Sequence, residues 1–318
     1  MKVVTVGTGR ITQWLITGFK EVGIEVFACV GRDKQKTEKF ARDNDIKFHG
    51  DNYDLILQSN AFDTVYLGIP NALHYEYAKK ALLAGKNVIV EKPFTSTVQQ
   101  AMELIAIADS KNLIVYDAMM VFHNIAYKQI KQDIKALGKI KLVELDFSKK
   151  SSKINDFYAG KDPSCFSTKL DGGALKDLNV YCISFAVGLF GRPESCHYYA
   201  NVEKGIDTSG IAILKYKDFV VSCSAGKDCN KGNLINIMGT NGYIYSNQTI
   251  STFNKYVVSL DNHELVKRAF PEVYSYHYEL EDLKSIMTYK DHKKNNEYLT
   301  STLITLKVIE ELQESMNK

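Results

Sequence analysis

The residues of this chain whose type and spacing could do chemistry begin with a glycine turn. The run Gly7-Thr8-Gly9-Arg10-Ile11-Thr12 directly follows the apolar run Val3–Val6 and opens a segment of helical period. Gly7 permits a tight turn, Gly9 lets the backbone approach a pyrophosphate, and the helix N-terminus offers unpaired N–H groups to the anion. The run predicts a dinucleotide-binding turn, and an ordinary glycine-rich turn is the alternative. Thr12 stands where Gly or Ala is usual, which predicts slightly wider packing of the helix on the strand.

The end of the next apolar run indicates which nicotinamide cofactor such a turn would accept. A carboxylate there bonds the ribose 2′-hydroxyl of NAD, whereas a basic residue accommodates the 2′-phosphate of NADP. The run Glu25–Val30 is followed by Gly31-Arg32-Asp33, with no acid at its tip and Arg32 next. This favours NADP, with NAD as the alternative. The other interpretation is that Arg32 points into solvent while Asp33 caps the following helix.

Lys92 lies between Glu91 and Pro93, directly after the apolar run Val88–Val90. In a doubly wound sheet the carboxyl ends of the strands face the ligand. A charged pair would be costly inside a core, and the proline favours an extended backbone at Lys92. We therefore expect Lys92 to donate a proton to a substrate oxygen or to bind that oxygen. A lysine in a surface turn is the alternative.

Asp177 and Tyr181 lie four residues apart in a predicted helix from about Gly173 to Leu189, so they share one helix face. The neighbouring apolar stripe consists of Leu178, Cys182, Phe185 and Leu189. An acid and a phenol beside a buried stripe indicate a lined cleft. A core or rim role for Tyr181 is the alternative, because the chain has 19 tyrosines. The combination with Lys92 favours a catalytic role.

Two patterns of elements must position these residues, and the first extends to residue 118. Short apolar runs alternate there with longer segments of helical period, which is typical of a parallel sheet covered by helices on both faces. The expected strands are Val3–Val6, Glu25–Val30, Thr64–Gly68, Val88–Val90 and Leu113–Tyr116. The helix after the first strand is expected to end near Gly23 and to bury a stripe of Ile11, Trp14, Leu15, Gly18, Phe19 and Val22. Thr97 and Gln100 fit a capping box that starts a later helix.

Beyond Phe122 the pattern is that of an α+β domain. We expect helices near 125–137 and 173–189, a strand at 140–147, and two final helices near 276–289 and 297–315. Further strands are expected at Ile211–Tyr216, Phe219–Ser224, Leu234–Met238, Tyr243–Ser246 and Tyr256–Leu260. The predicted fold class is α/β. It combines a Rossmann doubly wound parallel sheet in residues 1–120 with an α+β domain in residues 121–318, whose open sheet is predominantly antiparallel.

Composition excludes several classes of partner. Of the 318 residues, 45% are hydrophobic and 24% are charged, as in ordinary globular proteins. The 40 basic and 37 acidic side chains leave a net charge of +3, too small to make nucleic acid or an anionic membrane the default partner. No run approaches the ~18 apolar residues of a membrane span, and the first apolar run is too short for a signal peptide. We expect a cytoplasmic protein.

The cysteines and histidines give no sign of a metal centre. The six cysteines and seven histidines show no CxxC, HxH or HExxH spacing. We therefore expect reduced cysteines and no metal site.

Five motifs occur in an order and spacing that resemble the Gfo/Idh/MocA oxidoreductases along almost the whole chain. They are Gly7–Thr12; Gly68-Ile69-Pro70-Asn71 followed by His74; Glu91-Lys92-Pro93; Asp117-Ala118-Met119 leading to Phe122-His123; and Gly172-Gly173-Ala174-Leu175 leading to Asp177. The resemblance implies an N-terminal Rossmann domain and a C-terminal α/β domain whose open sheet often forms a dimer interface. It also implies nicotinamide-dependent oxidation or reduction of a sugar-like alcohol or carbonyl.

The resemblance also implies roles for individual residues. Lys92 and Tyr181 become the catalytic pair, and Asp177 becomes an acid that orients the substrate. The residues expected to bind the cofactor are Gly7, Thr8, Gly9, Arg10, Ile11, Arg32, Ile69, Pro70, Asn71, His74, Glu91 and Lys92. Many members have histidine at the position of Tyr181, and the usual three-glycine opening is here Asp171-Gly172-Gly173. The tyrosine resembles the dihydrodiol dehydrogenase, NADP-dependent xylose dehydrogenase and glucose-fructose oxidoreductase branches, which prefer NADP.

The expected function is an NADP(H)-dependent dehydrogenase or reductase of a sugar, polyol or vicinal diol, with the loop Asn155–Lys169 contributing to substrate choice. The apolar residues expected on the open sheet predict a homodimer or a dimer of dimers; they are Ile235, Ile237, Tyr243 and Tyr245. A nucleotide-binding sensor or regulatory subunit on the same fold is the alternative from another class. A third alternative is glycoside cleavage that uses a retained NAD.

Overall fold

The computed structural model describes residues 1–230, 232–261 and 265–316. Its contacts group the chain into two compact units, Met1–Ala118 with Tyr274–Thr300, and Met119–Val273 with Ser301–Lys318. The sequence-based boundaries, 1–120 and 121–318, differ from this division at Met119 and Met120 and in residues 274–300. Residues 274–300 return to the first unit, where the hydroxyl of Tyr274 donates to the carbonyl of Trp14 and Lys284 Nζ lies 2.6 Å from the carbonyl of Val22.

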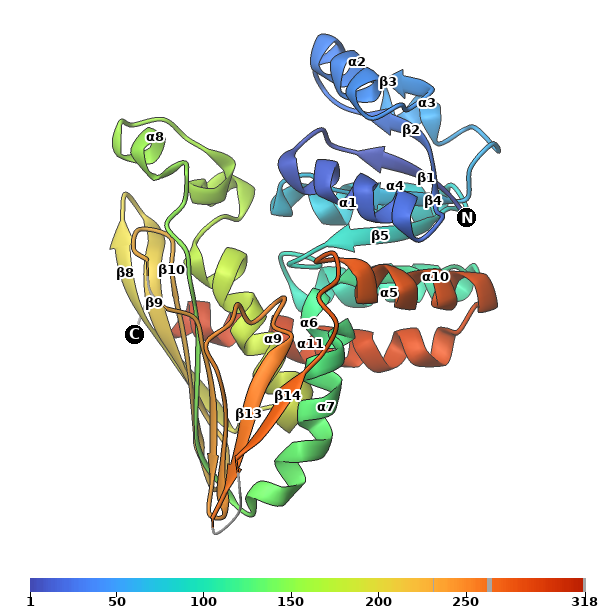
Figure 1. Cartoon of the computed structure of the whole chain (residues 1–318). Coiled ribbons are helices and arrows are strands. Elements are labelled where there is room, and N and C mark those ends of the chain that lie inside the picture. Colours follow the sequence, from blue (N-terminus) through green and yellow to red (C-terminus); the bar gives the residue numbers. More distant parts are fainter. Residues whose placement is uncertain (231, 262–264, 317–318) are drawn as a thin grey trace. The chain divides into compact units, whose positions relative to one another are not determined.

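The first unit is built on a six-stranded sheet with the order β3-β2-β1-β4-β5-β6 (Figure 1). The strands are β1 Lys2–Val6, β2 Glu25–Val30, β3 Phe48–Gly50, β4 Thr64–Leu67, β5 Asn87–Glu91 and β6 Val115–Ala118. All of its strand pairs are parallel. This confirms the doubly wound fold, and it places the switch in strand order between β1 and β4. The short strand β3 has no apolar run of its own and was missed by the sequence pattern.

The helices of the first unit follow the strands in alternation. They are α1 Arg10–Glu21, α2 Lys34–Asp43, α3 Tyr53–Ile56, η1 Asn71–Leu73, α4 His74–Leu83, α5 Val98–Ser110 and α10 His277–Tyr289. Thr97 caps α5 as predicted, since its side chain accepts a hydrogen bond from the backbone of Gln100. In α1 the predicted stripe is partly wrong, because Ile11 and Trp14 are 37% and 44% exposed. The buried residues of α1 are Thr12, Leu15, Ile16, Gly18 and Phe19, so Leu15, Gly18 and Phe19 of the predicted stripe are confirmed.

The second unit contains an eight-stranded sheet in the described part of the chain, with the order β14-β13-β12-β11-β7-β10-β9-β8. The strands are β7 Ile140–Ser148, β8 Ser195–Glu203, β9 Ile206–Lys215, β10 Val220–Gly226, β11 Leu234–Gly239, β12 Gly242–Ser246, β13 Lys255–Leu260 and β14 Val266–Ala269. Among the strand pairs of the described residues in this sheet, only β7 and β10 are parallel, so the predominantly antiparallel sheet is confirmed. The sequence pattern missed β8 and β14, which lie at the two edges.

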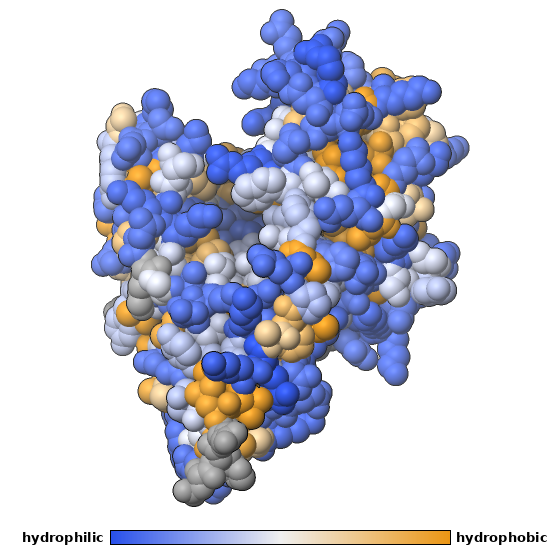
Figure 2. Space-filling view, in the orientation of Figure 1, coloured by the Kyte–Doolittle hydropathy of each residue, from blue (hydrophilic) through white to orange (hydrophobic). Residues whose placement is uncertain are grey.

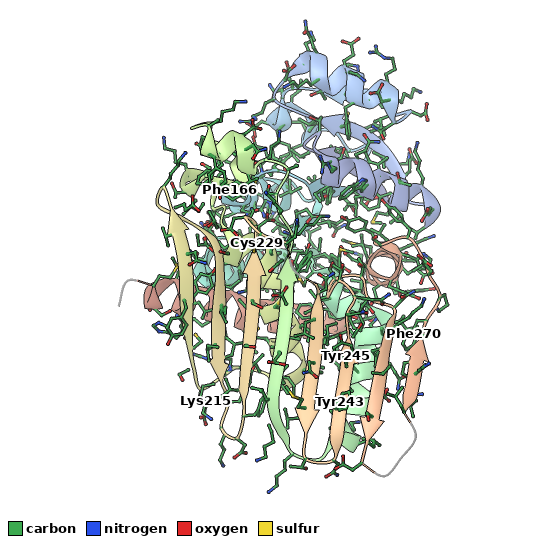
Figure 3. All side chains as sticks on the ribbon, turned by 60° about the vertical axis from the view of Figure 1, so that its left-hand side comes forward. Phe166, Lys215, Cys229, Tyr243, Tyr245 and Phe270 are labelled. Atoms are coloured by element: carbon green, nitrogen blue, oxygen red, sulfur yellow. The ribbon has the colours of Figure 1, made fainter. Side chains whose placement is uncertain are left out.

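Helices cover one face of this sheet, where α7 and α9 pack (Figure 1). The helical segments are α6 Met120–His123, α7 Ile125–Asp133, η2 Ile134–Leu137, α8 Ile154–Tyr158, η3 Ser164–Phe166, η4 Thr168–Leu170, the π-helical η5 Leu175–Asn179, α9 Val180–Phe190 and α11 His292–Ser315, which enters this unit at Ser301. Figure 3 looks onto the opposite face, which carries Tyr243 and Tyr245. Ile235 and Ile237 were also expected there, but both are fully buried, because they occupy the alternate positions of β11 that face the core.

One described helical stretch, Thr168–Phe190, is long and apolar enough by composition to cross a membrane. However, 67% of its most apolar window is buried inside the protein. A core helix of a soluble protein has the same property. Hydrophilic residues also cover most of the face shown in Figure 2.

Candidate active site

The glycine turn of the first unit lies at the switch between β1 and β4. Gly7 has a φ of +105°, and a Cβ at this position would lie 2.2 Å from the carbonyl oxygen of Gly68. The amide of Gly7 donates to the carbonyl of Val30, and the amide of Gly68 donates to the carbonyl of Val6. Gly7 is therefore required by backbone conformation and by the close approach of the turn after β4.

Gly9 has the opposite environment, since a Cβ there would meet nothing within 4 Å. It is the N-cap of α1, and it has no side chain to cap the helix. The first turn of an α-helix leaves N–H groups without partners in the helix, and the positive end of the helix dipole lies there. Thr8, Arg10 and Ile11 flank Gly9, and none of them is buried. The open space and the uncapped helix end fit the pyrophosphate of a dinucleotide.

Arg32 and Asp33 follow β2, and the structure shows different environments for them. Asp33 is the N-cap of α2, and its carboxylate accepts a hydrogen bond of 3.1 Å from the amide of Lys36. Arg32 is exposed. Asp33 thus has the capping role that the sequence allowed, while the guanidinium of Arg32 lies on the surface at the strand end where a ribose would bind.

His74 links the turns after β4 and β5. It is fully buried, with Nδ1 2.9 Å from the carbonyl oxygen of Pro93 and Nε2 3.0 Å from the carbonyl oxygen of Ile69. Carbonyl oxygens only accept hydrogen bonds. Whichever ring nitrogen of His74 carries a proton therefore donates it to the carbonyl beside it. In the structure His74 binds the carbonyl of Pro93, in the turn that carries Lys92. Its predicted contact with a cofactor stays a prediction.

Glu91 and Lys92 lie at the carboxyl end of β5, where both are half-buried. The hydroxyl of Tyr66, which is fully buried on β4, donates a 3.0 Å hydrogen bond to Glu91 Oε1. Burial, and secondarily the nearby Glu91, raises the pKa of Tyr66 well above its usual range, so the phenol remains a donor. Lys92 is joined to Pro93 by a cis peptide bond. The hydrogen bond from Tyr66 thus ties the side chain of Glu91, the residue directly before Lys92, to the neighbouring strand β4.

In the second unit, Asp177 lies on a π-helical turn and Tyr181 on the α-helix that continues it. The sequence predicted one regular helix, so the π turn is a departure, and such turns occur frequently at functional sites. Both side chains are half-buried. The ring of Tyr181 makes an edge contact with Phe147 on β7, with centroids 5.4 Å apart. Asp177 and Tyr181 therefore lie on neighbouring turns of one helical segment, and that they share one face of it stays a prediction.

Gly172 and Gly173 precede this helical segment and are needed for close packing. A Cβ on Gly172 would lie 2.8 Å from the backbone carbon of Cys165. Gly173 has a φ of +108°, and a Cβ there would lie 2.0 Å from Asp207 Oδ1. Asp207 is buried and accepts hydrogen bonds from the amide of Leu175 at 2.7 Å and from the hydroxyl of Tyr198 at 2.9 Å. The carboxylate of Asp207 thus caps the start of the segment that carries Asp177.

Lys227 is a residue of this region that sequence reasoning missed. Its Nζ lies 2.6 Å from Asp177 Oδ2, and its side chain is 2% exposed. It lies 50 residues further along the chain than Asp177, directly after β10, so no local spacing connects the two. The only sequence signal is a lysine directly after an apolar strand, which is the same signal that identified Lys92.

The structure thus groups the predicted residues by unit. Gly7, Arg32 and Ile69 follow parallel strands, and Glu91 is the last residue of another. The carboxyl ends of these strands share one edge of the first sheet. Asp177 and Tyr181 belong to the second unit. In the described ranges no three His, Cys, Asp or Glu side chains form a group that could hold a metal ion. The six cysteines are free thiols.

Comparisons with known proteins agree with this architecture. Over its full length the chain is similar to scyllo-inositol 2-dehydrogenase (NADP(+)) of Bacillus subtilis, with 27% identity covering 98% of this chain and 95% of that protein. It is 29% identical to trans-1,2-dihydrobenzene-1,2-diol dehydrogenase of Xenopus tropicalis, over 60% of this chain and 57% of that protein. The fold matches a crystal structure of a 3-ketoreductase from Actinomadura kijaniata, solved with NADP and TDP-benzene. The TM-score is 0.87 and the identity 20%, covering 99% of this chain and 97% of that chain.

Two descriptions of one protein family match successive parts of the chain. Residues 1–118 match the oxidoreductase family with an NAD-binding Rossmann fold, and residues 127–245 match the Gfo/Idh/MocA C-terminal domain. The two matches together span most of the chain in the order that the motifs predicted. This chain belongs to the Gfo/Idh/MocA family of oxidoreductases.

Proposed function

We propose that this protein is an NADP(H)-dependent oxidoreductase that transfers a hydride between nicotinamide and a carbinol or carbonyl carbon of a sugar, polyol or vicinal diol. The observation that carries the proposal is the environment of Gly9 at the switch point of the first sheet. An open, uncapped helix end follows a glycine whose positive φ and close approach to Gly68 strongly disfavour a side chain, which is the arrangement that binds a pyrophosphate.

The preference for NADP rests on Arg32. Its guanidinium is exposed directly after β2, and Asp33, the nearest acid, is engaged in capping α2. Arginine suits a 2′-phosphate because its planar fork forms charge-assisted hydrogen bonds with phosphate oxygens. The name of the Bacillus subtilis relative includes NADP(+), and the Actinomadura kijaniata reductase was solved with NADP, which supports the same preference. NAD is the alternative.

Proton transfer is assigned to Tyr181, Lys92 and Asp177. When bound, the nicotinamide supplies or accepts the hydride, so the oxygen on the reacting carbon must gain or lose a proton. The phenol of Tyr181 exchanges that proton, and the ammonium of Lys92 favours the phenolate form and binds the substrate oxygen. Asp177 accepts a hydrogen bond from a substrate hydroxyl. These roles require Tyr181, Lys92 and Asp177 to act on the same bound substrate.

The substrate class follows from the same groups. The carboxylate of Asp177 would accept a hydrogen bond from a hydroxyl next to the reacting carbinol. This arrangement suits a compound with oxygen substituents on adjacent carbons. The Bacillus subtilis and Xenopus tropicalis relatives are named for an inositol and a dihydrodiol, which share that feature. The protein is further proposed to be cytoplasmic and to form a homodimer or a dimer of dimers through the open face of its second sheet.

The test is a screen of the purified protein with NADP+ and NAD+ against aldoses, inositols and vicinal diols, measured by the absorbance of reduced cofactor. We expect turnover with NADP+ on at least one of these classes. Tight cofactor binding measured by fluorescence, without turnover of any compound in either direction, would instead support a nucleotide-binding sensor on this fold.

A further inference from the structure

Lys227 is a buried cation at the centre of the second unit's candidate site. Its Nζ contacts Asp177 Oδ2 and the carbonyl oxygen of Cys165, each at 2.6 Å, and lies 4.7 Å from the ring centroid of Phe166. The side chain is 2% exposed. A buried ammonium requires a partner of opposite charge and further hydrogen bonds, and Lys227 has both.

The backbone around Lys227 fixes the position of the ammonium. Its amide donates to the carbonyl of Thr208 on β9, and its carbonyl accepts from the amide of Ser151, each at 2.8 Å. Cys165, whose carbonyl contacts Nζ, also accepts from the amide of Gly173 at 3.2 Å. The side chain of Lys227 therefore contacts both the turn that carries Asp177 and the loop Asn155–Lys169, which is expected to contribute to substrate choice.

Exposure separates the roles of the two charged partners. The side chain of Asp177 is 34% exposed, so it can reach a small molecule, whereas Lys227 at 2% cannot. Two further charged groups of this region have other partners. Lys176 pairs with Asp171, and Asp207 on β9, which Lys227 also affects electrostatically, accepts hydrogen bonds from Leu175 and Tyr198. Lys227 can therefore act on a substrate only through Asp177 or through the loop.

We propose that Lys227 is a positioning residue, which fixes the ionised carboxylate of Asp177 toward a substrate hydroxyl and couples the loop around Cys165 to that carboxylate. The proposal rests on the proposed function in one respect, that Asp177 receives a hydroxyl of the substrate. Loss of the buried cation should leave the carboxylate harder to ionise and less well oriented, because an opposite charge within hydrogen-bond distance stabilises the ionised form.

The first test compares the pH dependence of kcat/KM in the wild type, Lys227→Met and Lys227→Arg. In Lys227→Met we expect the acid limb of kcat/KM to move to higher pH by about 1 to 3 units, the size of effect that an adjacent opposite charge has on a carboxyl group. Lys227→Arg should restore most of the wild-type profile, since it retains the charge. Lys176→Met is the matched control, because it removes the other buried lysine of this region, whose partner is Asp171. An acid limb that stays in place in Lys227→Met overturns the proposal.

The second test asks whether Lys227 acts through Asp177. In an Asp177→Asn background, the further change Lys227→Met should lower kcat/KM by less than about threefold, because residues that act as a unit are not additive. Fully multiplicative losses would contradict the proposal.

A third measurement does not depend on turnover. The carboxyl carbon of Asp177, observed by 13C NMR during a pH titration, should titrate at higher pH in Lys227→Met than in the wild type. An unchanged titration overturns the positioning role. If the wild type instead turns over none of the screened compounds, the proposed function fails, while the titration still decides whether Lys227 controls Asp177. Should Lys227→Met not fold, the titration is made on Lys227→Gln, and a profile unchanged from the wild type has the same meaning.

Discussion

The side chain of Thr12 on α1 occupies the space that a side chain on Gly68 would need. A Cβ on Gly68 would lie 2.3 Å from Thr12 Oγ1, and Thr12 is fully buried. The sequence has threonine where the dinucleotide fingerprint usually has Gly or Ala. The missing side chain at position 68, on the adjacent strand end, compensates for the larger residue. The first turn of α1 can therefore pack against the sheet although Thr12 is larger than Gly or Ala.

The two glycines of the turn should respond differently to alanine. In Gly7→Ala the new Cβ would meet the backbone of Gly68 at a positive φ, so we expect a loss of about 2 kcal/mol or more in the free energy of unfolding. In Gly9→Ala the Cβ meets no protein atom, so stability should change by less than about 1 kcal/mol while the Kd for NADP rises at least about tenfold. Urea denaturation and fluorescence titration measure the two quantities. Unchanged NADP binding in Gly9→Ala would place the pyrophosphate elsewhere.

Arg32→Ala should weaken NADP binding much more than NAD binding. Loss of a charge-assisted phosphate contact corresponds to about 1.5 to 3 kcal/mol of binding free energy. Arg42→Ala is the matched control, because Arg42 is an exposed arginine in the last turn of the same helix that follows Arg32. Isothermal titration with both cofactors makes the comparison. Equal losses for NADP and NAD would remove Arg32 from the selection.

Tyr181→Phe keeps the ring and its contact with Phe147 but removes the hydroxyl. We expect kcat to fall by about 10² to 10⁴, while the melting temperature and the Kd for NADP stay near the wild-type values. Tyr243→Phe, on the open face of the sheet, is the control for the loss of a phenol and should retain kcat. Full activity in Tyr181→Phe would end the proposed role of the phenol.

Lys92→Met should reduce kcat by a similar factor, because it removes the charge that favours the phenolate. The double variant Lys92→Met with Tyr181→Phe should be little worse than either single variant if the two residues act as a unit. Multiplication of the two losses would instead indicate independent roles.

Glu279 should make the protein less stable as pH rises. It is 3% exposed, and burial, together with Glu91 and Asp117, raises its pKa well above the usual range. The carboxyl is therefore protonated in the fold but ionised in the unfolded chain above about pH 4.3, so unfolding releases a proton. Relative to Glu279→Gln, the wild type should lose about 1.4 kcal/mol per pH unit between that value and its own raised pKa.

Urea denaturation at several pH values measures this difference. Glu103→Gln is the control, because Glu103 is paired with Lys79 and its pKa is lowered. Its stability difference from the wild type should not show the growth with pH that is expected for Glu279→Gln. Parallel pH profiles for the wild type and Glu279→Gln would show that Glu279 is ionised in the fold.

The open face of the second sheet should form a homodimer. Leu142, Met238 and Tyr243 are cross-strand partners on β7, β11 and β12, and Leu142 and Tyr243 are 39% and 40% exposed. An exposed apolar row of this kind favours association. Light scattering at micromolar concentration should give about twice the mass of one chain, and Tyr243→Glu should give the monomer. Tyr289→Glu, at an exposed site in the first unit, is the control. A monomeric wild type would refute this interface.

Local features of the fold were predictable from the sequence because neighbouring residues determine them. Thr97 and Asp33 cap the helices that follow them through hydrogen bonds to amides three residues away. The glycine turn after β1 was equally visible, since Gly7 needs a backbone conformation that other residues rarely adopt. The strands β1, β2, β4, β5 and β6 followed from hydrophobic period, whereas the short strand β3 did not.

The features that the sequence could not reveal depend on residues far apart along the chain. Residues 274–300 belong with the first unit because of contacts such as that of Tyr274 with Trp14, which are 260 residues apart. Contrary to expectation, Ile11 is exposed and Ile235 is buried, because the elements that pack on α1 and β11 decide which side of each is covered.

The candidate site divides in the same way. The sequence by itself determined the types and local spacing of Gly7, Lys92, Asp177 and Tyr181, because each belongs to a short motif with its own backbone requirement. Only the tertiary structure brought Lys227 within 2.6 Å of Asp177 and buried Glu279 near Glu91. The physical reason is that charge pairing and desolvation depend on distance in space, and that distance is set by the packing of whole strands and helices.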